Sequence, residues 1–343
     1  MSALTSRDVA RLAGVSQSTV SYVMSGNRPI SESTRSKVLA AMAELTYHPN
    51  AGARALASQR TSVIGLMLPF GPGADTVGTL PFIETIANAA RQREHEILLV
   101  TSTEGSDALR RLAGRKLCDA IVIMDIKRAD ERVAVAAGLD IPVVLIGVPE
   151  DAVGLHCVDV DFAMAARLAV DEMAATGHDQ VLLIGHPASV VSQDLNYVRR
   201  FADAAEIAAV RHGIRLDSMS PVEWNYAGAQ RAVEQVLAGR SVGERLGLLV
   251  PNTRTVQPLL TALREGGLDV GHDVSVIAVL QDLEAAETEP PVTNVSLRPR
   301  EVSRRAMETL FRLLDPVDGV EQPKSVSLIA PQLTRRATVM SLN

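Results

Sequence analysis

The hydrophobic pattern at the N-terminal end of the chain predicts three short amphipathic helices. The first begins near Thr5, where Thr5-x-x-Asp8 has the spacing of a capping box, and ends at Gly14, which can adopt the left-handed conformation. The second begins after Ser16 and the third after Ser31, both favourable N-cap residues. Only about three residues separate the first two helices, which is the spacing of a helix-turn-helix. In that motif the second helix can enter the major groove of DNA.

From Thr61 onward, continuous apolar runs rich in β-branched residues alternate with segments of helical periodicity. Such runs are typical of parallel sheets whose two faces are covered by helices. The predicted strands are 62–69, 96–102, 119–125, 142–148, 156–161, 180–186, 246–252 and 274–282. Two such units in series predict an α/β body of two doubly wound lobes. Ligands of such sheets bind at the carboxyl ends of the strands, in the cleft between the lobes.

A short segment of mostly small residues, 49–60, joins these two parts of the chain. Asn50 can cap a short helix that runs to about Ala57. One interpretation is a plain linker. The other is a helix that folds only when docked on DNA, with Leu56 wedged between base pairs in the minor groove. The residues alone leave both alternatives open.

Charge divides the chain in the same place. The 343 residues carry a net charge of −6, which by itself does not suit a nucleic-acid-binding protein. Residues 1–60, however, contain seven Lys and Arg residues and three acidic residues, so this segment carries +4 and the remainder −10. A basic head on an acidic body confines affinity for a polyanion to the head.

The outer face of the second predicted helix carries residues that can read bases. Gln17 can form two hydrogen bonds with adenine, and Ser18 and Ser21 can serve several bases. Tyr22 can bond a phosphate or pack on a thymine methyl group. Hydroxyl groups at helix starts suit phosphate oxygens, although a bundle with a solvated, serine-rich face is the alternative. The candidate DNA-contacting residues are Thr5, Ser6, Ser16, Gln17, Ser18, Ser21, Tyr22, Ser31, Thr34, Asn50, Arg54 and Leu56.

Residues 7–58 resemble the lactose-repressor (LacI/GalR) family of bacterial transcription regulators, with little or no gapping. Four motifs carry the resemblance: D-V-A-x-x-A-G-V-S at Asp8–Ser16, T-V-S at Thr19–Ser21, S-x-x-T-R at Ser31–Arg35 and Y-x-P-N at Tyr47–Asn50. The resemblance implies a homodimeric repressor whose paired recognition helices read a pseudo-palindromic operator. It also implies a small-molecule effector, bound between two lobes, that modulates operator affinity.

The resemblance assigns roles to particular residues of this head. It implies base contacts by Gln17, Ser18 and Tyr22. It implies a hinge helix near 50–57, with Leu56 as the minor-groove lever. Many members have Arg where this chain has Tyr22. Readout of guanine by Arg is therefore not expected from this position.

The resemblance also implies a body like a periplasmic binding protein, in which the chain crosses between lobes near 161, within 285–297 and within 320–326. The implied division is a head at 1–48, a hinge at 49–60 and an effector-binding and dimerisation body at 61–343. Lobe 1 would comprise about 61–161 and 296–322, and lobe 2 about 162–295 and 323–343.

Several positions of the expected cleft depart from sugar-binding members of that family. The departures are Asn196 or Tyr197 in place of Arg, Thr253 in place of Asp after Asn252, Leu280 and Gln281 in place of two carboxylates, and Leu297 in place of Gln. Together they predict a cleft with less charge and fewer bidentate hydrogen bonds. A site built for sugar hydroxyl groups should keep such partners.

Three interpretations of this cleft remain open. In the first, the effector is less polar or aromatic, and large aromatic side chains pack on it; the expected effector-binding residues are Phe70, Tyr197, Trp224, Asn252 and Leu280. In the second, the cleft is a vestige and the protein has no effector. In the third, a sugar binds through other groups. Ordinary core packing is the alternative role for Phe70 and Trp224.

Motifs of enzymes built on similar sheets are missing from the sequence. There is no G-x-G-x-x-G after a strand, no phosphate-loop Lys beside Gly71-Pro72-Gly73, and no G-x-S-x-G elbow. His156 and Cys157 are adjacent on a predicted strand and point to opposite faces, so no shared metal ion is expected. We expect neither catalysis nor a cofactor; the alternative is an enzyme or ligand-binding module whose head is purely structural.

Location and assembly follow from a few further features. No apolar run is long enough to span a membrane, and the N-terminus lacks the features of a signal peptide. Cys118 and Cys157 give no disulfide framework and suit a reducing cytoplasm, where we expect the protein to reside. No leucine heptads follow the body, so a dimer is expected rather than a coiled-coil tetramer.

Overall fold

The head is a bundle of three helices, as the sequence predicts. The computed structural model describes residues 4–25, 28–47, 60–70, 74–239, 245–316 and 325–340. The head comprises α1 (Ser6–Ala13), α2 (Gln17–Ser25) and α3 (Glu32–Glu44). Val9, Val20 and Val38, one from each helix, are fully buried and form the centre of its core. The predicted capping contact is present, because the Asp8 carboxylate accepts a hydrogen bond from the Thr5 backbone N–H at 3.0 Å.

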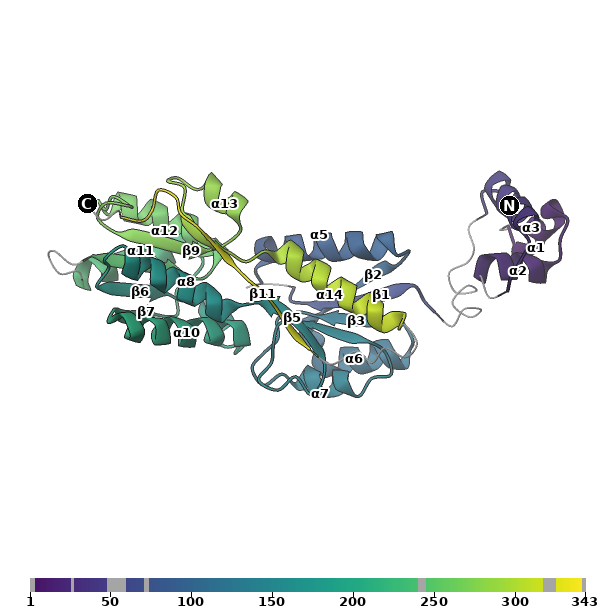
Figure 1. Cartoon of the computed structure of the whole chain (residues 1–343), viewed down its shortest axis with the longest axis horizontal. Helices are drawn as coiled ribbons and strands as arrows, with labels where there is room; N and C mark the ends of the chain where they lie inside the picture. The colour runs from purple at the N-terminus through teal and green to yellow at the C-terminus, as the bar shows by residue number, and fades with distance from the viewer. Residues whose placement is uncertain are drawn as a thin grey trace.

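Lobe 1 is a six-stranded parallel sheet with helices on both faces (Figure 1). Its strands are β1 (Val63–Leu68), β2 (Glu96–Thr101), β3 (Ala120–Ile123), β4 (Val143–Ile146), β5 (His156–Val160) and β11 (Val326–Ile329), in the order β11-β5-β4-β3-β1-β2. Its helices are α5 (Thr76–Gln92), α6 (Gly105–Gly114), α7 (Glu131–Ala137) and α14 (Pro299–Leu314), with a short 3-10 turn, η1 (Ser102–Glu104). Ile64 and Leu66 pack in the core beneath α5 and α14, whereas Met67 packs in the core beneath α6 and α7.

Lobe 2 repeats this arrangement. Its strands are β6 (Gln180–Ile184), β7 (Arg215–Met219), β8 (Leu246–Val250), β9 (Ser275–Val279), β10 (Thr293–Ser296) and β12 (Gln332–Thr334), in the order β12-β10-β9-β8-β6-β7. Its helices are α8 (Phe162–Ala175), α9 (Ala188–Val191), α10 (Asn196–His212), α11 (Tyr226–Gly239), α12 (Thr253–Glu265) and α13 (Asp282–Glu287). The pairing is parallel except between β10 and β12. One core lies beneath α8 and α10, and the other beneath α11 and α12.

The eight strands predicted from apolar runs are confirmed as β1 to β6, β8 and β9. The strands that the pattern missed are short or polar. β7 is an edge strand whose residues are mostly exposed, so it needs no apolar run. β10 is buried but polar; its Asn294 Nδ2 donates to the Leu280 carbonyl at 2.8 Å, and the Thr293 N–H donates to Thr338 Oγ1 at 2.8 Å. Such internal hydrogen bonds allow polar side chains in a buried strand.

The chain crosses between the lobes after β5, after β10 and after β11. The last of these corrects the expected division. Residues 326–329 pair with Cys157–Val160 in the sheet of lobe 1, so assigning 323–343 as a whole to lobe 2 is wrong. The third crossover lies between Ile329 and Gln332, beyond the expected 320–326. The sequence of this edge strand does not mark which of the two sheets it joins.

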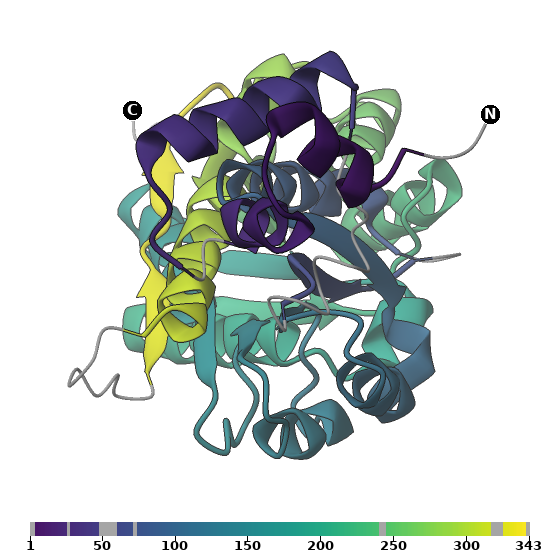
Figure 2. The same cartoon turned by 90° about the vertical axis from the view of Figure 1, so that its right-hand side faces the viewer.

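Asp119 fixes the start of the body to lobe 1. Its carboxylate accepts hydrogen bonds from the Thr61 N–H at 2.8 Å and from the Ser62 N–H at 2.8 Å. Just before them, Arg60 Nη1 contacts Asp315 Oδ1 at 2.8 Å, close to the end of α14. The segment that leads from the head is thus anchored to lobe 1, which faces the viewer behind the head in Figure 2.

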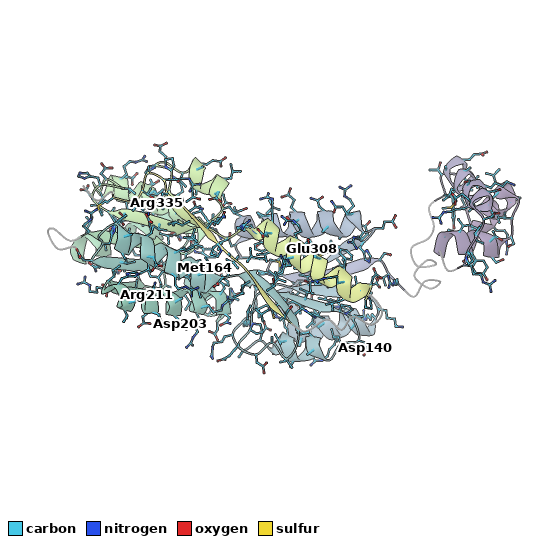
Figure 3. All side chains as sticks on the ribbon, viewed as in Figure 1. Asp140, Met164, Asp203, Arg211, Glu308 and Arg335 are labelled. Carbon is cyan, nitrogen blue, oxygen red and sulfur yellow. The ribbon has the colours of Figure 1, made fainter. Side chains whose placement is uncertain are left out.

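Arg335, labelled in Figure 3, ties the C-terminal segment to lobe 2. Its Nη2 donates to the Glu172 carboxylate of α8 at 2.7 Å. Cys118 and Cys157 are free and buried, and burial raises the pKa of these thiols to about 11 and about 12. Within the described ranges, no helix is long and apolar enough to cross a membrane, and no cluster of His, Cys, Asp and Glu could hold a metal ion.

Candidate functional site

The connection between α1 and α2 is a tight turn at Gly14. This residue has φ of 66° and ψ of 34°, the left-handed conformation that favours glycine. The Val15 N–H donates back to the Ala10 carbonyl at 3.0 Å, which closes the end of α1. Ser16 then caps α2 by accepting a hydrogen bond from the Thr19 N–H at 3.1 Å. The predicted helix-turn-helix connection is therefore present.

The outer face of α2 is polar and solvent-accessible. Gln17, Ser18 and Ser21 are all exposed. Gln17 Nε2 donates to Ser6 Oγ of α1 at 2.9 Å, and Ser16 Oγ lies 2.7 Å from Ser18 Oγ. These contacts are made by exposed groups, which DNA could replace with its own acceptors.

Tyr22, on the same helix, is half-buried and pairs with a residue that the sequence interpretation did not connect to it. The guanidinium carbon of Arg28 lies over the Tyr22 ring, 5.1 Å from the ring centroid. A cation in this position is attracted by the negative face of the ring. Arg28 therefore supplies a positive charge next to Tyr22, the position at which many members of the resembled family have Arg.

The remaining candidate residues of the head lie at helix N-termini or outside the described residues. Thr5 is the N-cap of α1. Ser31 caps α3, accepting a hydrogen bond from the Thr34 N–H at 3.3 Å, and the two hydroxyl groups lie 2.8 Å apart. Free N–H groups at these helix starts suit phosphate oxygens. Asn50, Arg54 and Leu56, the candidates of the hinge, lie outside the described residues.

A cavity of about 160 Å³ lies between the two lobes of the body. Its walls include residues directly after β3, β6 and β8, at the carboxyl ends of these parallel strands, as expected for such sheets. A cavity of roughly 150 Å³ accommodates benzene. The space therefore suits a compound with a single ring better than a large oligosaccharide.

Three carboxylates from lobe 1 line this cavity: Asp75, Asp125 and Asp159. Asp159 is buried and accepts a hydrogen bond from Arg200 Nη1 of lobe 2 at 2.7 Å. Asp75 caps α5 and accepts a hydrogen bond from the Gly78 N–H at 3.1 Å. Among the described residues, none donates a hydrogen bond to the Asp125 carboxylate. Asp125 also has φ of 51°, an uncommon backbone conformation that Asp tolerates better than most residues.

Burial dominates the titration of the two inner carboxylates. It raises the pKa of Asp125 from 3.8 to about 6, against the lowering effect of Arg132, and the charge of Asp75 adds to the rise. Burial likewise raises the pKa of Asp159 to about 6, although the Arg200 guanidinium opposes it. Burial thus destabilises the charged form of both carboxylates. Strongly shifted pKa values of this kind are typical of functional sites.

The facing wall, from lobe 2, is aromatic. The ring centroid of His186 lies 6.2 Å from that of Tyr197 and 6.3 Å from that of Trp224, both in edge-to-face geometry. The ring centroid of Phe162 lies 4.9 Å from that of Tyr197. Burial lowers the pKa of His186 to about 4, so this residue is neutral at pH 7 and contributes no positive charge.

Three buried nitrogen atoms on this wall have no hydrogen-bond partner among the described residues: His186 Nδ1, Trp224 Nε1 and Asn252 Nδ2. Asn252 is only 6% exposed, and its Oδ1 accepts a hydrogen bond from the Thr255 N–H at 2.9 Å, which fixes the amide group. Buried polar atoms without a partner are uncommon in folded proteins. Unpaired nitrogens lining a cavity are therefore candidate ligand contacts.

The structure brings together only part of the expected effector-binding set. Tyr197, Trp224 and Asn252 line the cavity, whereas Phe70 and Leu280 do not. Leu280 is 2% exposed and packs inside the core of lobe 2, so an apolar side chain there stabilises the lobe. Phe70 is 39% exposed and is not part of the cavity lining.

The sequence comparison predicted a cleft with less charge than in sugar-binding members, but three carboxylates line the cavity. It considered positions that had lost carboxylates and left out Asp75, Asp125 and Asp159, and it did not place His186 among the effector-binding residues. A signal for one of them was present, because Asp125 is the last residue of the predicted strand 119–125. Position relative to strand ends, more than comparison with sugar-binding sites, would have located these groups.

The fold and these two sites define a class of protein: a helix-turn-helix head attached to a two-lobed ligand-binding body. Comparisons agree with each half. The profile described as "Bacterial regulatory proteins, lacI family" matches residues 5–50, and that of a periplasmic binding protein-like domain matches residues 170–339. The regulator AglR of Rhizobium meliloti (strain 1021) is 30% identical over 339 residues, covering 92% of this chain and 90% of that protein. The chain therefore belongs to the lacI family.

Individual relatives extend over the whole chain. The lactose operon repressor of Escherichia coli (strain K12) is 26% identical, covering 100% of this chain and 92% of that protein. A crystal structure of the lac repressor dimer bound to operator and the anti-inducer ONPF matches with a TM-score of 0.81 and 25% identity, covering 99% of this chain and 100% of that one. The protein is a DNA-binding transcriptional regulator with a small-molecule effector domain. The relatives compared are regulators and not enzymes.

Proposed function

We propose that two copies of this chain bind a pseudo-palindromic operator, one α2 helix per half-site, and that a small molecule between the lobes changes operator affinity. The observation that carries the proposal is the polar, exposed face of α2 beside the left-handed turn at Gly14. A helix presented in this way can enter the major groove. Two-fold symmetry of a dimer then requires two-fold symmetry of the site.

The chemistry of this face supports sequence-specific readout. The Gln17 amide can form paired hydrogen bonds with adenine, and Ser21 can donate to or accept from several base edges. The guanidinium carbon of Arg28 lies 5.1 Å from the centroid of the Tyr22 ring, so this guanidinium group and the Tyr22 hydroxyl group can act together on a phosphate or a guanine. We propose that Ser31 and Thr34 contact the phosphate backbone.

An exposed apolar surface on lobe 1 supports assembly as a dimer. On α5, Val77 and Leu80 are 57% and 63% exposed, and on the neighbouring edge strand β2, Leu99 is 47% exposed. Exposed apolar patches and open strand edges are liabilities unless a partner covers them. A second copy that covers this surface would bring the two heads to the same side.

Contacts across the cleft can couple ligand binding between the lobes to operator affinity. Asn196 Nδ2 donates to the Val148 carbonyl at 2.7 Å, and Arg128 Nε contacts Asp194 at 3.2 Å. Each pair joins lobe 1 to lobe 2. A ligand that binds one arrangement of the lobes more tightly than another shifts the population between them, by no more than its differential affinity. Lobe 1 carries the start of the body, so such a shift would change the spacing of the two heads.

Selection from a pool of random duplexes with the full-length chain tests this proposal. The selected sequences should be two-fold symmetric. Gln17→Ala should lose discrimination of about 1–3 kcal/mol at one symmetric pair of positions, whereas the exposed control Gln235→Ala on α11 should not. Selection of no sequence, or loss of the same discrimination with Gln235→Ala, would contradict the proposal.

A further inference from the structure

The cavity between the lobes has more negative charge than its surroundings neutralise. Of its three carboxylates, Asp159 is paired with Arg200 at 2.7 Å. Arg132, the cation whose charge lowers the pKa of Asp125, already holds Asp130 at 2.6 Å. Asp75 and Asp125 are therefore left to face the cavity without an ion pair among the described residues.

Arg254, a further cation near the cavity, contacts other groups than these carboxylates. Arg254 lies over the outer wall, with its guanidinium carbon 4.9 Å from the centroid of Trp224, and donates to the Ala74 carbonyl at 3.5 Å. No ion pair joins Arg254 to a carboxylate within the described residues. His186 is held neutral by burial, which lowers its pKa to about 4.

The two walls differ in chemistry. Lobe 1 presents carboxylate acceptors, and lobe 2 presents aromatic faces together with the unpaired nitrogen atoms of Asn252 and His186, which are 6% and 3% exposed. A ligand that satisfies both walls needs a donor-rich, positive end, a flat ring and an acceptor. Charge decides between a cation and a neutral polyol, because hydroxyl groups can accept and donate hydrogen bonds but cannot neutralise two carboxylates in a partly buried space.

We propose that the effector is a small organic cation with a single flat ring. Its positive, hydrogen-bond-donating group lies against Asp75 and Asp125, its ring lies between Tyr197 and Trp224, and an acceptor atom meets Asn252 Nδ2. This inference rests on the proposed effector role of the cavity. Stacking on Tyr197 and Trp224 adds a cation–π attraction when the charge is delocalised into the ring.

Benzamidine and benzamide form a matched pair of probes, because they have nearly the same shape and differ in charge. Trp224 is the single tryptophan of the chain and lines the cavity, so its fluorescence reports binding to the full-length protein. Benzamidine should bind at least about tenfold more tightly than benzamide, a difference of about 1.4 kcal/mol. Isothermal titration of both compounds provides the check that does not depend on fluorescence.

The variant Asp125→Asn should abolish this preference while the protein stays folded. Asn is nearly isosteric with Asp and tolerates the left-handed backbone at this position. Asp75→Asn should weaken the preference as well, since Asn also caps a helix effectively. Asp107→Asn is the matched control on lobe 1, because that carboxylate is 92% exposed and lies outside the cavity.

Three results would overturn the inference: equal or tighter binding of benzamide, saturable binding of the neutral polyol myo-inositol at lower concentration than benzamidine, or no saturable benzamidine binding. Selection of operator duplexes does not depend on any of them. Failure of the cation preference with a successful duplex selection would refute the ligand class and leave the regulatory function standing.

Discussion

Arg200 on α10 of lobe 2 and Asp159 on β5 of lobe 1 form an ion pair across the cleft, with Nη1 and Oδ2 2.7 Å apart. The side chains are 20% and 9% exposed, so little water screens the pair. It lies directly at the cavity lining and joins two lobes whose arrangement we expect a ligand to alter. The pair is therefore both a structural contact and one of the cross-lobe contacts through which we propose that a ligand changes operator affinity.

Arg200→Met should destabilise the full-length protein by about 3 kcal/mol at neutral pH, because it leaves the buried Asp159 carboxylate without its partner. The pKa of Asp159 is already raised to about 6, and losing Arg200 raises it further. The cost should therefore shrink as the pH falls and the carboxyl group becomes neutral. Chemical denaturation at about pH 7.5 and about pH 5 measures this.

The control for that substitution is its neighbour. Arg199 contacts Asp203, labelled in Figure 3, at 3.4 Å, and both side chains are 59% exposed. Arg199→Met should change stability by less than about 1 kcal/mol. Equal effects of the two substitutions would show that the cross-lobe pair has no special role in stability.

Asp125→Asn should stabilise the protein while removing the proposed cation site. Burial raises the pKa of Asp125 from 3.8 to about 6, so ionised Asp125 destabilises the folded state by up to about 3 kcal/mol above pH 6. This penalty fades as the pH falls through the window from about 6 to about 4. Thermal unfolding should show a higher Tm for the variant at about pH 7.5 and a smaller gain at about pH 5. A lower Tm at both values would show that the carboxylate stabilises the fold.

Gly14→Ala should weaken the helix-turn-helix through backbone strain alone. The φ of 66° is unfavourable for Ala by about 1 kcal/mol, and a Cβ atom at Gly14 meets nothing within 4 Å. Hydrogen exchange of α1 and α2 in the full-length protein should accelerate. Gly14→Asn, which tolerates this conformation better, should have a smaller effect. Identical exchange in all three proteins would contradict the role assigned to this turn.

Leu99→Arg should disrupt the proposed dimer without unfolding the monomer, because Leu99 is 47% exposed on the edge strand β2. Sedimentation should show a monomer, and operator affinity should fall. Leu237→Arg, at a 43% exposed position on α11, is the matched control and should remain a dimer. A Leu99→Arg protein that still forms dimers would exclude this surface as the interface.

Sequence patterns predicted the fold because burial dominates it. The apolar runs that became β1 and β8 are almost entirely buried, and the caps at Thr5 and Ser31 are local signals that act within four residues. Edge strands such as β7 and β11 were not predicted, because one side of an edge strand faces solvent and needs no apolar run.

The cleft was harder to predict because its residues come from distant segments. Tyr197 and Trp224 were predicted from their large aromatic side chains and line the cavity, but Leu280 packs in the core of lobe 2. Asp125 was missed because a single carboxylate at the end of a strand does not indicate a ligand site until the residues of the opposite wall are known. Charge balance in a cavity is a property of both lobes together, and a pattern along one segment does not contain it.

Sequence-specific binding of DNA is best tested by fluorescence anisotropy of the full-length protein with a selected operator duplex, measured from about 50 mM to about 200 mM salt. We expect affinity to fall steeply with salt, by about a thousandfold or more, and a scrambled duplex of equal length to bind far more weakly. Equal affinity for operator and scrambled duplex at every salt concentration, or no binding to either, would contradict sequence-specific binding.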